Sequence, residues 1–468
     1  MSDILTTSHL REAEHALIEA IRAQTPERVA RPASPDPDEI LHRIGITYLP
    51  STRPNGFIKL YPHDFLVEEL SADGSTVSLS HPSLFQSAED QRTLWADLIK
   101  ANISGPHAMS DLQQLLGVEA GKIGYAGIKD SMAVTSQRLS LRGVTKEAAE
   151  QLTHDRMMLR PIRYGSGAIQ PGELKGNRFT IAVRTALDED INHLLQKLNS
   201  DGFLNFFGAQ RFGPRLVAQR MGQKLLQDDA EGALRFFFGE PGPFDIPLYR
   251  EVRETLKDAF GNWDYMIELA SCFPFTFQNE LKVLHALQKE PSKTRQALGQ
   301  IQEQVKMWVY AYGSWLVNRH LSHLVESGQT IAQELPLALS EQGPPAEYRD
   351  FMEQDGTMQY LEMLHKYPYV QAARRNIPAR IIPEGLVWKK IKQGWVIRFS
   401  LPKGAYATTC LSHLFRLYEN LPVPEWVKGD EIEVLQAIDD GTISSLRERF
   451  ASVLVRRDLK AEEKEEDL

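Results

Sequence analysis

The chain contains little of what a metal site or a disulfide framework needs. Cys272 and Cys410 are the only cysteines in 468 residues, too few for a metal cluster or a set of disulfides. Thirteen histidines are scattered through the sequence, and none lies in an H-E-x-x-H or similar ligand spacing. The sequence therefore gives no indication of a metal site.

Long hydrophobic runs are also absent. No apolar stretch approaches the length that a transmembrane helix needs. The first residues lack the apolar core of a signal peptide, and acidic side chains such as Asp3, Glu12 and Glu19 argue against a transit peptide. We therefore expect a cytoplasmic protein without a membrane partner. No obligate protein partner is evident in the sequence.

The third absence is an excess of positive charge. Lys and Arg number 53 against 62 Asp and Glu, so the net charge is −9, of which residues 461–468 supply −4. Distribution is more informative than the total. Basic residues gather at 156–178 and 371–393, each with a single acidic residue. Solvated faces are the simplest interpretation of these segments, but they are also compatible with an RNA partner.

The length is sufficient for two or three domains. The pattern is mixed, then mainly helical, then mixed again, which indicates a helical domain inserted into a split α+β domain. We predict five segments: an N-terminal helix with a proline-rich linker (1–44), the first part of the α+β domain (45–213), the helical insertion (214–375), the second part (376–457) and an acidic tail (458–468).

Hydrophobic periodicity predicts the individual elements. We expect helices at residues 4–23, 94–118, 146–156, 188–198, 217–238 and 295–327. We expect strands near 138–142, at 169–184 after a turn, and within 377–401. Aromatic residues recur at helical spacing in 307–319, so we expect them in the core rather than in a base-stacking platform.

The most informative stretch is 121–142, where three glycines (Gly121, Gly124 and Gly127) precede Lys129 and Asp130. Glycines allow a tight turn and a close approach to a neighbour. An aspartate after such a turn is commonly a turn former or a helix cap. A phosphate-binding loop fails on spacing, because it needs Gly-Lys followed directly by Ser or Thr. The third interpretation is that Asp130 is a catalytic carboxylate.

Four segments together resemble the TruD-type tRNA pseudouridine synthase family. They are GFIKLYPHDFLVEE around Lys59, GYAGIKDSMAVTSQ around Asp130, GFLNFFGAQRFG around Asn205, and LPKGAYATT near the C-terminus. The resemblance covers about residues 45–450, thinly across the insertion. It implies a catalytic domain of the pseudouridine-synthase fold, with a mixed or antiparallel sheet, split by a mainly helical, family-specific insertion. Phe206 departs from the family pattern, where a tyrosine is usual, and such departures affect RNA-facing loops more than the chemistry.

The resemblance also implies a reaction and its catalytic residues. A pseudouridine synthase breaks the bond from ribose C1′ to uracil N1 and rejoins the base through C5, so it needs neither a cofactor nor a metal. The resemblance places the one indispensable carboxylate at Asp130. A stacked base would remove solvent from that carboxylate and disfavour its charge, and a neighbouring cation would offset this effect. The family pattern assigns the cation to Lys59, and Lys129 is the weaker candidate because neighbouring side chains of an extended chain point to opposite faces.

Substrate-binding residues follow from the same pattern. Phe207 matches the platform on which the target base stacks, and Asn205 could hydrogen-bond the uracil edge or the catalytic carboxylate. If the backbone is extended there, Phe203 would share their face. Phe65 matches an aromatic residue near the pocket, and Arg211 could hold a phosphate. Without the resemblance, both Phe203 and Phe207 would be read as core.

Two functions remain open at this point. The first is a tRNA pseudouridine synthase that acts at uridine 13, with Asp130 serving either as a nucleophile at C1′ or as a base. The second is an RNA-binding or RNA-remodelling protein on the same scaffold with little or no catalysis, which the motif departures and the acidic net charge suggest. The presence of Lys59, Asp130, Asn205 and Phe207 together favours the enzyme.

Overall fold

The computed structural model describes residues 2–50, 52–82, 93–165, 167–186 and 189–460, so the predicted acidic tail lies outside it from residue 461 onward. The chain divides into two compact units. We name the one drawn from Met1–Leu49 and Leu204–Arg380 the helical unit, and the one drawn from Pro50–Phe203 and Ile381–Asp467 the sheet unit. These limits lie near the predicted domain bounds at 44, 213 and 375 without coinciding with them, and the predicted bounds stay a prediction.

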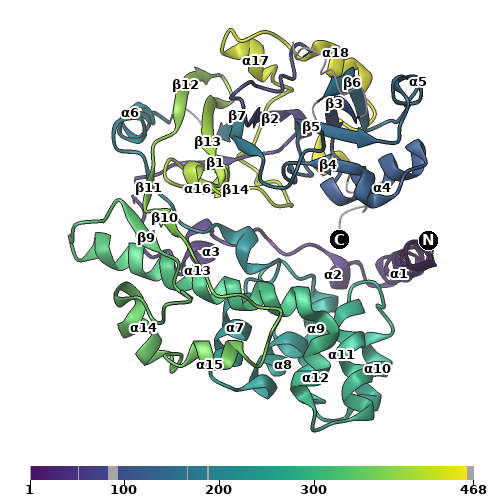
Figure 1. Ribbon diagram of the computed structural model, residues 1–468, viewed down its shortest axis with the longest axis vertical. Helices are drawn as coiled ribbons and strands as arrows, with labels where there is room; N and C mark the ends of the chain where they lie inside the picture. Colours follow the sequence, from purple (N-terminus) through teal and green to yellow (C-terminus); the bar gives the residue numbers. More distant parts are fainter. Residues whose placement is uncertain (1, 51, 83–92, 166, 187–188, 461–468) are drawn as a thin grey trace. The chain divides into compact units, whose positions relative to one another are not determined.

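The sheet unit is built on a ten-stranded sheet (Figure 1). Its main path runs β12 (Glu384–Ile391), β13 (Gly394–Pro402), β7 (Leu174–Thr185), β2 (Phe65–Ser71), β5 (Val134–Arg142), β3 (Thr93–Ala101) and β6 (Met157–Gly165). Strands β2 and β5 are parallel, whereas the other neighbours on this path are antiparallel. The short strand β4 (Ile123–Tyr125) pairs with β5, and β1 (Asn55–Phe57) joins β7 to β14 (Arg416–Tyr418). The predicted α+β class with a mixed sheet is confirmed.

Both faces of this sheet are covered. On one face Val67, Ile181 and Ile397 pack with residues of α6 (Asn192–Asp201) and α16 (Ala407–Ser412). On the other face Leu66, Ala182 and Val396 pack with α17 (Val434–Ala437) and α18 (Ser444–Arg449), which Figure 1 shows on the opposite side of the sheet from α16. Because successive residues of a strand point to opposite faces, each central strand is apolar on both sides. A third cluster joins β3 and β5 to α4 (Gly105–Leu116) and α5 (Lys146–Glu150).

The helix predicted over 94–118 is wrong in its first half. Residues Thr93–Ala101 form β3, which lies between β5 and β6 and is buried on both faces, and only Gly105–Leu116 is helical. A strand buried on both faces loses the period-two pattern, so its leucines cannot be distinguished from a helix by spacing. The helix predicted at 146–156 is also shorter than expected, since α5 ends at Glu150 and β6 begins at Met157.

The helical unit is organised around α13 (Gln302–Glu326). Trp308 and Tyr312 are buried there, which confirms the core interpretation of the aromatic residues in 307–319. Helix α7 (Ala218–Leu226) packs closely on α13 at Gly222, where a Cβ would collide with the carbonyl oxygen of Trp308. The predicted helix at 217–238 is two helices, α7 and α8 (Ala230–Gly239). The remaining elements of the unit are α2 (Pro26–Val29), α3 (Pro37–Arg43), α9 (Pro247–Asp258), α10 (Trp263–Ala270), α11 (Gln278–Lys289), α12 (Thr294–Leu298), α14 (Arg349–Gln354) and α15 (Tyr360–Leu364), with the strand pair β9 (Glu334–Pro336) and β10 (Asn376–Pro378).

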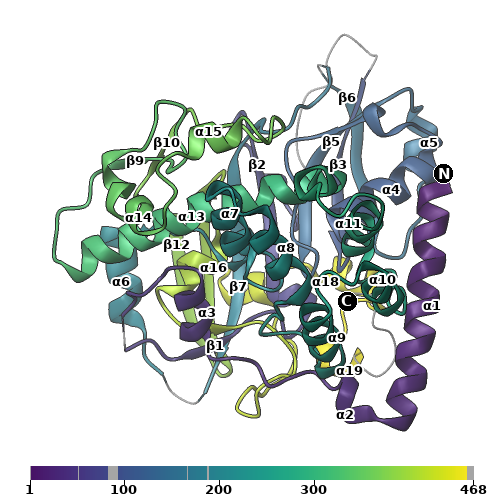
Figure 2. The same cartoon turned by 90° about the horizontal axis from the view of Figure 1, so that it is seen from below.

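The N-terminal helix is confirmed as α1 (Ser2–Gln24), which Figure 2 shows as a long straight helix. Glu14 of α1 is 4% exposed and accepts hydrogen bonds from the hydroxyl of Tyr249 at 3.0 Å and from the main-chain N–H groups of Phe275 and Thr276 at 2.8 and 3.0 Å. The predicted extension is therefore attached to the helical unit by a buried carboxylate whose oxygens are bonded.

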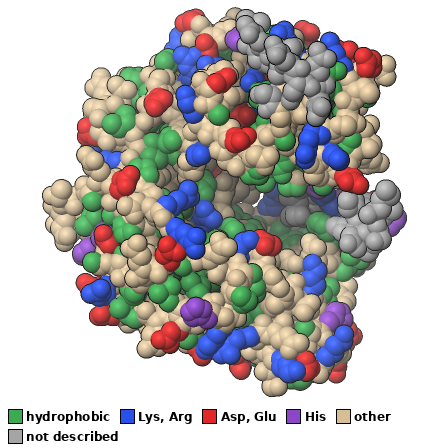
Figure 3. Space-filling model, viewed as in Figure 1, with side chains coloured by type: hydrophobic (Ala, Val, Ile, Leu, Met, Phe, Trp, Pro, Cys, Tyr) green, Lys and Arg blue, Asp and Glu red, His purple; other side chains and the backbone are tan. Residues whose placement is uncertain are grey.

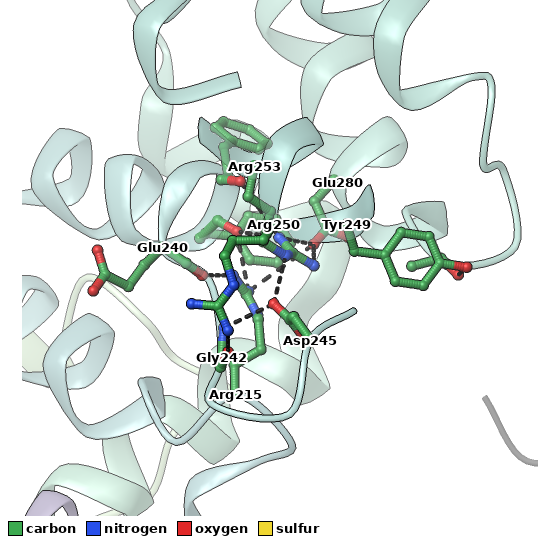
Figure 4. A network of polar contacts seen from close by, with 11 residues as sticks. Arg215, Glu240, Gly242, Asp245, Tyr249, Arg250, Arg253 and Glu280 are labelled. Carbon is green, nitrogen blue, oxygen red and sulfur yellow. Dashed lines mark hydrogen bonds and ion pairs between the residues drawn. The ribbon is translucent and has the colours of Figure 1, made fainter. Parts of the chain in front are cut away.

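The helical unit also contains a buried charge network (Figure 4). Arg253 contacts Glu280 at 3.2 Å and Asp245 at 3.6 Å, while Arg215 lies 4.0 Å from Glu280. Arg215 also donates to the main-chain carbonyl of Glu240 at 2.8 Å. Burial lowers the pKa of Arg215 to about 10, with the neighbouring Arg253 acting in the same direction. Two arginines and two carboxylates thus lie together in one largely buried cluster.

Candidate active site

Asp130 lies in the loop that joins β4 to β5, next to the central strands of the sheet unit. Its side chain is 26% exposed, so its carboxylate is half-buried but reachable. Of the three glycines that precede it, Gly124 has a close neighbour, because a Cβ there would collide with the Ile169 carbonyl oxygen. Gly121 faces open space, so the expectation of a close approach at all three glycines is wrong.

The loop is attached to the strands on two sides. Lys129 points away from Asp130 into the protein, where its Nζ lies 2.7 Å from Oε2 of Glu69 on β2. On β3, the ammonium group of Lys100 donates hydrogen bonds to the main-chain carbonyls of Asp130 and, at 2.8 Å, Ile103. These contacts fix the main chain on either side of the Asp130 carboxylate.

Lys100 is fully buried, and this burial lowers its pKa to about 8. The Asp130 charge opposes the shift, whereas the nearby Lys129 charge adds to it. Since both hydrogen-bond acceptors of Lys100 are neutral carbonyls, the protein gives its charge less compensation than an ion pair would.

Lys59 supplies the cation beside Asp130. Its Nζ lies 3.7 Å from Oδ1 of Asp130, and its side chain is only 5% exposed. The ring of Phe65, at the start of β2, lies beneath the ammonium group with 4.6 Å from Nζ to the ring centroid. Lys59 has a φ of 60°, a left-handed conformation that costs a residue with a side chain about 1–3 kcal/mol and persists only where the surroundings enforce it. The two segments that carry the first two family motifs therefore meet at this ion pair.

A second carboxylate shares Lys59. Oε2 of Glu419 lies 3.4 Å from the same Nζ, and its side chain is 32% exposed. The parallel pairing of β1 with β14 explains this contact, because Phe57 lies opposite Tyr418 and both chains continue past that pair in the same direction. Arg457 donates to the main-chain carbonyls of both Lys59 and Glu419, at 3.1 and 2.8 Å.

Phe65 is placed beside Lys59, but its ring is 1% exposed and packs edge-on against Phe179. It supports the ammonium group from below in this structure. A contact between Phe65 and a substrate stays a prediction.

Asn205, Phe207 and Arg211 belong to the helical unit, and their relation to Asp130 also stays a prediction. Asn205 donates from its side chain to the Pro378 carbonyl at 2.9 Å. The Arg211 guanidinium lies 5.5 Å from the centroid of the Phe207 ring, which is half-buried. The Nε atom of Arg211 is buried and has no hydrogen-bond partner within the residues that the structure describes.

The expected common face of Phe203, Asn205 and Phe207 is wrong. Strand β8 spans only Phe203–Leu204, and the Phe206 N–H donates to the Leu204 carbonyl two residues earlier, so the chain turns instead of remaining extended. Phe203 lies in the core of the sheet unit. Asn318 of α13 holds the Phe207 main chain, since its side-chain oxygen accepts from the Phe207 N–H at 2.8 Å and its amide group donates to the Phe207 carbonyl at 2.9 Å.

The two basic segments are partly neutralised, and Figure 3 shows basic and acidic side chains interspersed over the face in view. Arg178 lies 2.8 Å from Glu68, and Lys389 lies 3.5 Å from Asp439. The segment 371–393 is divided between the two units at residue 380, so it does not form one patch within either of them. Within the described ranges no helix is long and apolar enough to cross a membrane, and no group of three His, Cys, Asp or Glu side chains could hold a metal ion.

Sequence reasoning missed three residues of this site: Glu419, Lys100 and Arg457. Glu419 is 360 positions from Lys59, and nothing in its local sequence marks it. Lys100 was hidden by the incorrect helix prediction. Once residues 93–101 are recognised as a buried strand, a lysine at position 100 becomes conspicuous, because lysine is almost never fully buried without a reason.

Comparisons with known proteins point in one direction. The sequence profile of the family tRNA pseudouridine synthase D (TruD) matches residues 43–339. A curated protein of Methanopyrus kandleri, named probable tRNA pseudouridine synthase D, is 29% identical over 328 residues, which cover 66% of this chain and 81% of that protein. A protein of the same name from Thermococcus onnurineus is 27% identical over 414 residues, covering 77% of this chain and 95% of that protein.

The fold has a counterpart among solved structures. A Methanosarcina mazei protein, solved under the name tRNA pseudouridine synthase D (TruD), superposes with a TM-score of 0.65. The match covers 82% of this chain and 99% of that protein at 20% identity. At this identity the likeness shows the fold.

Proposed function

This chain belongs to the tRNA pseudouridine synthase D (TruD) family, and we propose that it converts uridine 13 of tRNA to pseudouridine with Asp130 as the catalytic carboxylate. The family makes the chain a tRNA pseudouridine synthase, an intramolecular isomerase. The choice of uridine 13 and the role of Asp130 are the proposal.

One observation supports the catalytic role most strongly. A half-buried carboxylate lies 3.7 Å from a buried ammonium group, in a loop whose neighbouring main chain is held by Lys129 and Lys100. An opposite charge at this range favours the ionised form of a carboxylate when a substrate excludes water. The reaction requires such a charged and reachable group beside the ribose.

The chemistry can be assigned to the chain's own groups. The C1′–N1 bond breaks, the C1′–C5 bond forms, the proton at C5 leaves and N1 ends protonated, so the reaction is balanced without an added reagent. Asp130 supplies the negative charge beside the ribose, either as the nucleophile at C1′ or as a base that accepts a proton. Lys59 keeps that charge in place as water is excluded.

The base must leave its stack before it can react, which costs a few kcal/mol. Phe207 offers an aromatic face to the extruded base, and stacking of this kind is worth about 1–3 kcal/mol. Asn205 hydrogen-bonds the uracil edge and Arg211 holds a phosphate. These three roles rest on the family pattern and on the exposed part of each side chain.

The test is to incubate the protein with unmodified tRNA transcripts and to map pseudouridine at single-nucleotide resolution. We expect product at uridine 13 with the wild type and none with Asp130→Asn, which should keep its fold and its RNA affinity. Asp155→Asn is the matched control, because Asp155 is an exposed aspartate of the same unit. Full activity of Asp130→Asn would refute the role of Asp130. Salt-sensitive RNA binding without product from any transcript would instead favour a binding protein.

A further inference from the structure

The ammonium group of Lys59 contacts two carboxylates, and the nearer one is not Asp130. It donates a hydrogen bond to Glu419 at 3.4 Å, whereas its contact with Asp130 is an ion pair at 3.7 Å. A side-chain contact of about 3.6 Å or more is no longer a hydrogen bond, so only the contact with Glu419 counts as one. Lys59 therefore lies close enough to Asp130 to act on its charge but too far away to occupy its oxygens with a hydrogen bond.

This division is built into the fold. The parallel register of β1 and β14 brings Lys59 and Glu419 to the same end of the strand pair. Arg457 bonds the main-chain carbonyls of both residues, which fixes the two backbones relative to each other. The ring of Phe65 closes the remaining side of the ammonium group at 4.6 Å. Lys59 adopts a left-handed φ of 60° within this arrangement.

We propose that Glu419 is a positioning residue for the isomerisation: it holds the Lys59 ammonium group away from Asp130, so that Asp130 keeps a nearby positive charge while its oxygens remain free to meet the ribose. This inference rests on the proposed function. Among the residues that the structure describes, Asp130 and Glu419 are the carboxylates in contact with Lys59. Without Glu419, the ammonium group would therefore move onto Asp130. A direct ion pair would then compete with the sugar for the same oxygen atoms.

A role exerted through Lys59 predicts strong coupling between the two residues. We would measure single-turnover rates of pseudouridine formation for the wild type, Glu419→Gln, Lys59→Met and the double variant. Glu419→Gln keeps the shape and a hydrogen-bond acceptor but removes the charge that holds the ammonium group. We expect it to lower the maximal single-turnover rate about tenfold, with the enzyme concentration that gives half of this rate within about twofold of the wild type, a coupling in the range found for contacting residues.

The same substitution in the Lys59→Met background should change the rate by less than about twofold, because the ammonium group that Glu419 contacts is absent there. A merely structural role would instead damage both backgrounds equally. Glu425→Gln, an exposed glutamate of the same segment, is the matched control and should behave like the wild type. Near-ultraviolet circular dichroism would check that each variant keeps its tertiary packing.

Three results would overturn the inference. Wild-type rates for Glu419→Gln would show that the carboxylate is not needed, and equal losses in both backgrounds would show that it does not act through Lys59. If one of these two results occurs while the wild type forms product and Asp130→Asn forms none, this inference fails but the proposed function stands. Absence of product from the wild type on every transcript would overturn the proposed function and this inference together.

Discussion

Lys100 provides a stability test that does not depend on activity. Its folded pKa is about 8 against an ordinary value of 10.5, because burial disfavours its charge. Between these two values the unfolded chain binds a proton that the folded protein has released. Stability therefore rises with pH across this window, and the cost of the buried charge is fully present below pH 8.

The size of the effect follows from the same two values. Each unit of pKa difference corresponds to about 1.4 kcal/mol, so the buried charge costs about 3 kcal/mol at pH 7. At pH 9.5 most of the folded molecules carry a neutral Lys100, while the unfolded chain remains mostly protonated. Wild-type stability should consequently gain about 2 kcal/mol between pH 7 and 9.5 from this one residue.

The measurement compares the wild type with Lys100→Met by urea unfolding at both pH values, using tryptophan fluorescence and far-ultraviolet circular dichroism. The variant loses two hydrogen bonds, a cost that is the same at both pH values, and it lacks the titrating group. The difference between the two proteins should thus shift by about 2 kcal/mol in favour of the wild type at pH 9.5. Lys122→Met, at an exposed lysine of the same unit, should show no such shift. Parallel pH profiles for the wild type and Lys100→Met would refute the assignment of a neutral amine at high pH.

Two further predictions concern the helical unit. Glu280→Gln removes the carboxylate that Arg253 contacts at 3.2 Å in the network of Figure 4, and breaking a buried pair costs about 3–5 kcal/mol, which urea unfolding should show. The control Glu231→Gln, at an exposed ion pair, should cost less than about 1 kcal/mol, and equal losses in the two variants would contradict the reasoning. Asn318→Leu leaves the Phe207 N–H, the Phe207 carbonyl and the Ile44 carbonyl without their side-chain partner, and each buried group left unpaired costs about 1–3 kcal/mol of stability. Hydrogen exchange of the Phe207 amide should therefore accelerate strongly, and unchanged exchange would show that Asn318 does not hold this segment.

The sequence predicted well the elements whose pattern is local. Helix α1 has apolar residues at helical spacing, although Leu10 and Leu17 are exposed, and β7 follows a turn that contains Gly and Pro, so each carries its own signal. The aromatic residues of α13 were correctly assigned to the core for the same reason. Strand β3 failed because its surroundings, not its own residues, decide its conformation: it is hydrogen-bonded on both edges and covered on both faces. Leucine-rich segments of that kind can adopt either structure until their neighbours are known.

The candidate site shows the same contrast between local sequence signals and contacts that depend on distant segments. Asp130 and Lys59 were found through motifs whose residues are contiguous, and their meeting is a consequence of strand order, which no spacing in the sequence reveals. Glu419 reaches Lys59 because β14 joins β1 in parallel, and these two residues are 360 positions apart in the sequence. A resemblance carried by local motifs therefore points to the proposed catalytic group more readily than to the groups that hold it. The charges around Asp130 make this concrete: the cation belongs to a recognisable motif, whereas the carboxylate that restrains the cation belongs to none.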